Sequence, residues 1–190
     1  GPDGRGTWLS DEGSVGLAHT RLSILDLSDT GAQPMDAPQG STHLVLNGEI
    51  YNYLELKESL RDEGIRWRGT SDTEVLLHWL SLKGIDGLRD IDGMFGLAFY
   101  DEREGVLWLA RDPVGEKPVY YSLRNNRVTG FASETRALVE AGLGGTGLSS
   151  EGLSMLLRKG SIAAPWTQYD DIRLLRPGHW LRIDTRRGEW

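Results

Sequence analysis

The stretch Asn47-Gly48-Glu49-Ile50-Tyr51-Asn52 decides how the fold of this 190-residue chain is interpreted. It follows His43-Leu44-Val45-Leu46, an apolar run that predicts a short β-strand. An Asn-Gly pair after such a run is the strongest short signal for a hairpin, because both turn positions favour a positive φ. Taken alone, the pair therefore predicts a turn at Asn47 and Gly48 and indicates no chemistry.

The segments that follow this stretch predict helices with well-marked ends. A helix is expected from Tyr53 to Glu63, closed by Gly64. Ser71-Asp72-Thr73-Glu74 has the pattern of a capping box, in which the serine side chain accepts the glutamate amide and the glutamate side chain reaches back. The apolar run after it predicts a second helix, which Gly84 would end.

Two hairpins are predicted further along the chain. Met94–Tyr100 and Val106–Ala110 are apolar on both faces, so they should form a central hairpin that is covered on each side. Pro118–Leu123 and Arg127–Ala132 should form the other. The remaining expected elements are a strand at 14–18, helices capped by Ser133 and Ser149, and a strand at 180–183.

The composition limits the class of protein. With 38% hydrophobic and 26% charged residues, the chain predicts one soluble globular domain. A net charge of -7 argues against a nucleic-acid partner, and no apolar run approaches the roughly 20 residues of a membrane span. We therefore expect a cytoplasmic protein without membrane contact. The four histidines lie in separate segments without metal-ligand spacing, so no metal site is predicted.

Arg21 and Asp72 have ordinary interpretations when each is taken by itself. Arg21 is expected to be a surface charge that pairs with Asp26 or another acid. Asp72 is expected to be a first-turn acid that the helix dipole favours. On spacing alone, the sequence predicts an α+β domain and no reaction.

The motifs of the chain nevertheless form an ordered series that runs almost from end to end. They are Gly1–Gly4, Leu17–Asp26, Gly31–Met35, Asn47–Asn52, Thr70–Glu74, Asp92–Phe95, Arg111–Tyr121, Phe131–Glu134 and Arg176–His179. In this order they resemble the glutamine-hydrolysing asparagine synthetases. One departure is mild, because Pro113 stands where that family usually has a basic residue.

The resemblance implies that residues 1–190 form a class II glutamine amidotransferase domain that lacks its first segment. The implied fold is that of the N-terminal-nucleophile (Ntn) hydrolases, an α+β four-layer sandwich of two antiparallel sheets flanked by helices. In the family, the first residue is a cysteine whose α-amine acts as its base, whereas this chain contains no cysteine. We therefore expect the chain alone to be inactive, and a missing first strand to leave Met94–Tyr100 or Val106–Ala110 with an unpaired edge.

The resemblance also implies the roles of five residues. The side-chain amide of Asn47 and the backbone N–H of Gly48 would form the oxyanion hole. Arg21 would hold the α-carboxylate of glutamine through its fork of donors. Glu49 and Asp72 would bind the polar ends of the substrate, with Asp72 as the partner of the α-ammonium.

The implied function is to supply ammonia from glutamine to an ATP-dependent synthetase domain that amidates aspartate. The domain itself would need no cofactor, whereas the synthetase domain, expected after residue 190, would use ATP and Mg²⁺. The expected partners are glutamine, this synthetase domain and a second copy in a homodimer. The alternative is a degenerate glutaminase-like domain that binds or assembles without catalysis.

Overall fold

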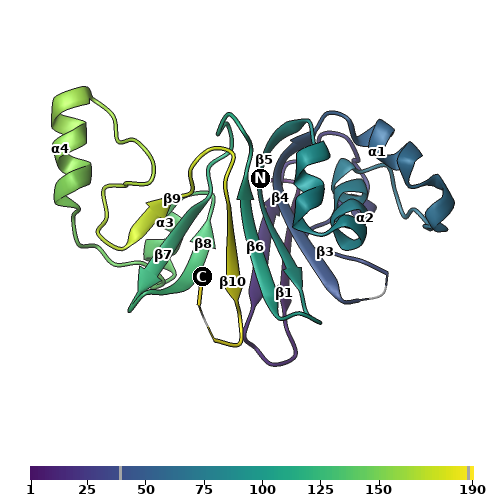
Figure 1. Cartoon of the computed structure of the whole chain (residues 1–190), viewed down its shortest axis with the longest axis horizontal. Helices are drawn as coiled ribbons and strands as arrows, with labels where there is room; N and C mark the ends of the chain where they lie inside the picture. The colour runs from purple at the N-terminus through teal and green to yellow at the C-terminus, as the bar shows by residue number, and fades with distance from the viewer. Residues whose placement is uncertain (39, 188) are drawn as a thin grey trace.

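A five-stranded antiparallel sheet forms the centre of the protein, for which the computed structural model describes residues 1–38, 40–187 and 189–190 (Figure 1). Its strands follow one another in the order β10-β6-β5-β4-β3. They are β3 (Met35–Asp36), β4 (Thr42–Ile50), β5 (Gly93–Asp101), β6 (Val106–Arg111) and β10 (Trp180–Asp184). β5 pairs along its full length with β4, which makes these two strands the structural centre of the sheet.

Helices α1 (Tyr53–Ser59) and α2 (Asp72–Lys83) cover one face of this sheet (Figure 1). Leu44, Leu46 and Ile50 of β4 point to this face and pack in one core with the buried leucines of α2. Short 3-10 turns occupy 29–31, 61–63 and 85–90. Alternation along β4 thus places its even-numbered residues toward the helices.

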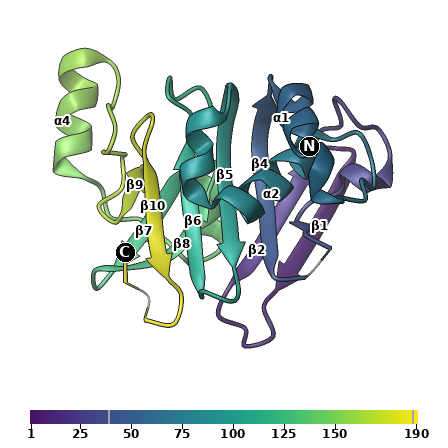
Figure 2. The same ribbon diagram turned by 45° about the vertical axis from the view of Figure 1, so that its right-hand side comes forward.

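Two smaller groups of strands cover the opposite face (Figure 2). One is the hairpin of β1 (Gly4–Leu9) and β2 (Gly16–Arg21), and the other has the order β8-β7-β9. The strands of the latter are β7 (Tyr120–Arg124), β8 (Arg127–Ala132) and β9 (Ile172–Leu174). Leu17 of β2 and Tyr121 of β7 share one core with Val45 of β4, so both groups lie in the same layer.

Two short helices complete the fold. Leu138 of α3 (Thr135–Glu140) lies beside Gly130 of β8, on the side of that strand away from the core around Tyr121, so the layers run helix, sheet, sheet, helix. Helix α4 (Ser150–Lys159) stands at one end of the molecule, and Gly152 is its only buried residue (Figures 1 and 2). Among the described residues, none of the helices has the length and apolar character needed to span a membrane.

The turn predicted at Asn47 and Gly48 is wrong, because both residues lie inside β4. Gly48 has a φ of +154°, and a Cβ there would collide with the carbonyl oxygen of Met94 and lie 2.7 Å from Phe95 Cα. The glycine is required because β4 and β5 approach each other closely, and no turn is involved.

The capping box is formed differently from the prediction. Ser71 does cap α2, but its hydroxyl accepts the amide of Thr73 at 3.1 Å. The Glu74 carboxylate, fully buried, accepts the backbone amides of Arg68 at 2.8 Å and Gly69 at 3.0 Å. Glu74 therefore ties down the loop before the helix, because two amides of that loop need a buried acceptor.

Two other helix ends also differ from their predicted positions. The helix predicted to Glu63 ends at Ser59 and continues as a 3-10 turn before Gly64. Helix α3 begins after Glu134, and Ser133 does not cap it.

The prediction of an unpaired edge on the central hairpin is wrong as well. β5 lies between β4 and β6, and β6 lies between β5 and β10. β5 and β6 are apolar on both faces because other layers of the protein pack above and below the sheet. The layer formed by the β1–β2 hairpin and the β8-β7-β9 sheet has unpaired edges near its middle. Among the described residues, these edges belong to β2 and β8 (Figures 1 and 2).

Candidate functional site

One edge of β4 is left open by the sheet and closed by side chains. β3 pairs with β4 only at His43 and Leu44, so no strand covers this edge further along. There the Leu46 N–H donates to Gln33 Oε1 at 2.6 Å, and the Ile50 N–H donates to Asp72 Oδ2 at 2.8 Å. Gly48 lies between them in the same alternation, so its N–H points to the same edge, where no side chain of the described residues accepts it.

Asp72 reaches this edge because it is the first residue of α2. The residue is 5% exposed, and the other oxygen of its carboxylate, Oδ1, accepts the Thr73 amide at 2.7 Å. Burial raises the pKa of Asp72, while the hydrogen bonds from Ile50 and Thr73 lower it. Asp72 thus combines the first position of α2 with a direct contact to β4.

Asn47 and Glu49 point to the face of β4 that lies away from the helices, toward the layer that contains β2 and β7, as Val45 does. Asn47 is exposed, and its amide makes no hydrogen bond with another described residue. Glu49 is half-buried; desolvation and then the charge of Asp72 raise its pKa, whereas Lys117 lowers it. Within the described part of the chain, an amide and a backbone N–H without partners and the Glu49 carboxylate therefore lie on one short segment of β4, and the Asp72 carboxylate contacts the edge of that strand.

Arg21 ends β2 and is held by the loop that follows it. Its Nη1 donates to the Ser28 carbonyl at 2.7 Å, and its Nη2 donates to the Asp26 carbonyl. The predicted pairing with the Asp26 carboxylate is therefore replaced by a bond to the backbone. That carboxylate instead accepts hydrogen bonds from Ser28, Thr70 and Thr30, which hold the pKa of Asp26 well below its ordinary value.

His19 of β2 lies beside β4, on the same strand as Arg21. The sequence alone did not identify it as a site residue. It lies two residues before Arg21 on β2, and its Nδ1 is buried without a hydrogen-bond partner in the described part of the chain. Burial lowers the pKa of His19, and the Leu46 carbonyl acts in the opposite direction. Arg21 thus shares the inner face of β2 with His19, whose ring lies beside Leu46 of β4.

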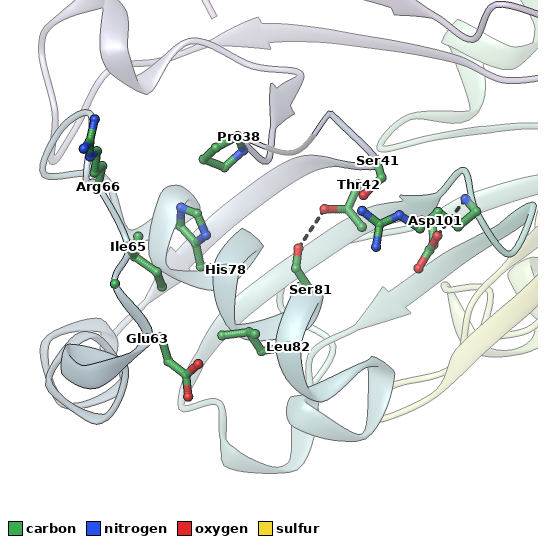
Figure 3. Close-up of a pocket in the computed structure, with 12 residues that line it drawn as sticks. Pro38, Ser41, Thr42, Glu63, Ile65, Arg66, His78, Ser81, Leu82 and Asp101 are labelled. Atoms are coloured by element: carbon green, nitrogen blue, oxygen red, sulfur yellow. Dashed lines mark hydrogen bonds between the residues drawn. The ribbon is translucent and has the colours of Figure 1, made fainter.

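A cavity of about 480 Å³ lies elsewhere, at the far end of α2 (Figure 3). The described residues that line it include Thr42, His78, Ser81 and Asp101, but none of the five predicted site residues. Within it, Thr42 Oγ1 and Ser81 Oγ are hydrogen-bonded at 2.7 Å and join β4 to α2 (Figure 3). The candidate site is therefore the stretch of β4 at Asn47 and Gly48, whose two donors have no partner among the described residues.

A family model described as a glutamine amidotransferase domain matches residues 1–189. The chain belongs to this family. The glutamine amidotransferase domain is 37% identical to Amidase chry2 of Gibberella zeae over 95% of the chain and 26% of that protein. It is 35% identical to the glutamine-hydrolyzing asparagine synthetase 1 of Bacillus subtilis over 96% of the chain and 28% of that protein.

Two further comparisons agree with this assignment. Asparagine synthetase B of Escherichia coli is 39% identical over 73% of the domain and 24% of that protein. The glutamine phosphoribosylpyrophosphate amidotransferase structure from B. subtilis matches with a TM-score of 0.55 and 25% identity, over 67% of the domain and 29% of that chain. The domain thus has the Ntn-hydrolase amidotransferase fold that the sequence predicted. It spans about a quarter of the length of the relatives named above.

Proposed function

We propose that this domain hydrolyses the side-chain amide of glutamine and supplies the ammonia to an asparagine synthetase-type partner domain. The observation that carries the proposal is the Gly48 N–H, a backbone donor left free on a rigid strand beside the exposed Asn47 amide. Two such donors stabilise the oxyanion that forms on an amide under attack, and losing one typically costs about 3 kcal/mol of transition-state stabilisation.

The nucleophile must come from outside these 190 residues, because they contain no cysteine. A thiolate would add to the amide carbon of glutamine, the C–N bond would break, and ammonia would leave with the proton that the α-amine base had taken from the thiol. Water would then release glutamate from the thioester. The unpaired edges of β2 and β8 support this proposal, since they leave room in the hydrogen-bond pattern for a strand that carries the cysteine.

The charged residues would orient glutamine. The donors of Arg21 that the loop does not use would hold the α-carboxylate. Asp72 and Glu49 would attract the α-ammonium. The ammonia would pass to a synthetase domain that uses ATP and Mg²⁺ to amidate aspartate, in a cytoplasmic and homodimeric enzyme. The names of the bacterial relatives, which are glutamine-hydrolyzing asparagine synthetases, support the proposed type of synthetase domain.

Ammonia release from glutamine tests the proposal. The 190-residue chain should release none, whereas the polypeptide that includes the cysteine segment should be active. In that polypeptide Asn47→Ala should mainly lower kcat, and Arg21→Ala should mainly raise KM. Wild-type kinetics in both variants would refute the site assignment. Glutamine binding without ammonia release would favour the degenerate, non-catalytic alternative.

A further inference from the structure

The hydrogen bonds on the open edge of β4 form a continuous path that returns to the same strand. The Leu46 N–H donates to Gln33 Oε1 at 2.6 Å, and Gln33 Nε2 donates to Thr73 Oγ1 at 3.3 Å. The Thr73 hydroxyl donates to Asp72 Oδ1 at 3.4 Å, while Asp72 Oδ2 accepts the Ile50 N–H at 2.8 Å. The path leaves β4 at Leu46, crosses the start of α2 and re-enters β4 at Ile50.

Gly48 lies midway between the two ends of this path. A neighbouring strand on this edge would pair every second residue and would therefore consume the Gly48 N–H. Side chains can accept the amides of Leu46 and Ile50 and leave the one between them free. The arrangement thus gives β4 a fixed edge without using up the donor.

We propose that Gln33 and Thr73 are positioning residues that, together with Asp72, hold the edge of β4 so that the Gly48 N–H meets the oxyanion formed from glutamine. We call these three residues the edge bracket. The inference rests on the proposed function, because it assigns the bracket to the same reaction. Gln33 is half-buried and Thr73 is buried, so water competes poorly for their hydrogen bonds.

The chain offers a matched control for Thr73. Thr42 is 5% exposed and Thr73 is 4% exposed, and each hydroxyl takes part in a hydrogen bond that helps to join β4 to α2. The bond between Thr42 and Ser81 lies at the far end of the helix, in the cavity of Figure 3. Thr42→Val and Thr73→Val therefore remove the same chemical group from similarly buried positions, but only Thr73 belongs to the edge bracket.

Amide hydrogen exchange in the 190-residue chain tests the bracket without any activity. Gln33→Leu and Thr73→Val should speed exchange at Leu46 by about tenfold, since each removes a hydrogen bond that holds this amide or its acceptor. Thr42→Val should leave exchange at Leu46 unchanged. Unchanged exchange at Leu46 in both bracket variants would overturn the inference.

Kinetics in the polypeptide that carries the cysteine test the link to catalysis. Thr73→Val should lower kcat by about tenfold and change KM by less than about threefold, because the oxyanion exists only in the transition state. Thr73→Ser should restore kcat, and Thr42→Val should keep it. A Thr73→Val kcat equal to that of Thr42→Val would overturn the inference. A wild-type polypeptide that releases no ammonia would refute the proposed function instead, and the exchange rates would still decide whether the bracket exists.

Discussion

Replacing Gly48 by alanine tests whether close strand approach is what requires glycine there. The added Cβ would meet the carbonyl oxygen of Met94 and Phe95 Cα, which are backbone atoms that cannot move without disturbing β5. A residue with a side chain at a φ of +154° carries roughly 1–3 kcal/mol of strain, and the forced contact adds roughly 1–3 kcal/mol. We therefore expect the free energy of unfolding to fall by about 2–6 kcal/mol.

Gly64→Ala is the matched control for this experiment. Gly64 also has a positive φ, +66°, but a Cβ there would have no atom within 4 Å, so only the backbone cost of about 1–2 kcal/mol should appear. Urea unfolding followed by fluorescence of the seven tryptophans measures both variants. If Gly48→Ala lost no more stability than Gly64→Ala, the close-approach argument would be refuted.

Two further predictions concern stability. Leu77→Ala, at a fully buried position of α2, should lower the free energy of unfolding by about 2–5 kcal/mol. Leu82→Ala, at 51% exposure on the same helix, should lower it by under about 1 kcal/mol. Equal losses in denaturant unfolding would contradict the assigned core. The pKa of Asp26 is lowered below 3.8, so its ionised form stabilises the native state above that pH, and the stabilisation is lost as the pH falls toward the folded-state value. Asp26→Asn should therefore flatten the decline of unfolding free energy between about pH 5 and pH 2; a decline as steep as in the wild type would show that Asp26 does not carry it.

Elements with strong local signals were predicted well. Helix α2 begins after Ser71 and ends before Gly84, and the hairpin of β5 and β6 is central and covered on both faces, as its apolar residues indicated. The short strands β1, β3 and β9 were not predicted. β9 has three residues and forms because Tyr121 and its neighbours on β7 pair with it, which no local pattern encodes.

The site was predicted in part, and for a physical reason. The motifs around Asn47 and Asp72 pointed to the two elements that meet there, although the local Asn-Gly signal indicated a turn that tertiary pairing overrides. Gln33 was missed as a site residue, because its partners lie 13 and 40 residues away in the sequence. Only the fold brings these side chains together, so periodicity and spacing carry no signal for them.

The unpaired edges of β2 and β8 have a consequence for protein chemistry. A strand that fills such a position is held by backbone hydrogen bonds and packing, so a covalent link to the rest of the chain is not required for it to bind. Under the proposed function such a strand would carry the nucleophile, so a synthetic peptide added to the 190-residue chain would deliver it. Semisynthesis of this kind would allow the attacking atom to be exchanged, for example sulfur for selenium, while every genetically encoded residue stays the same.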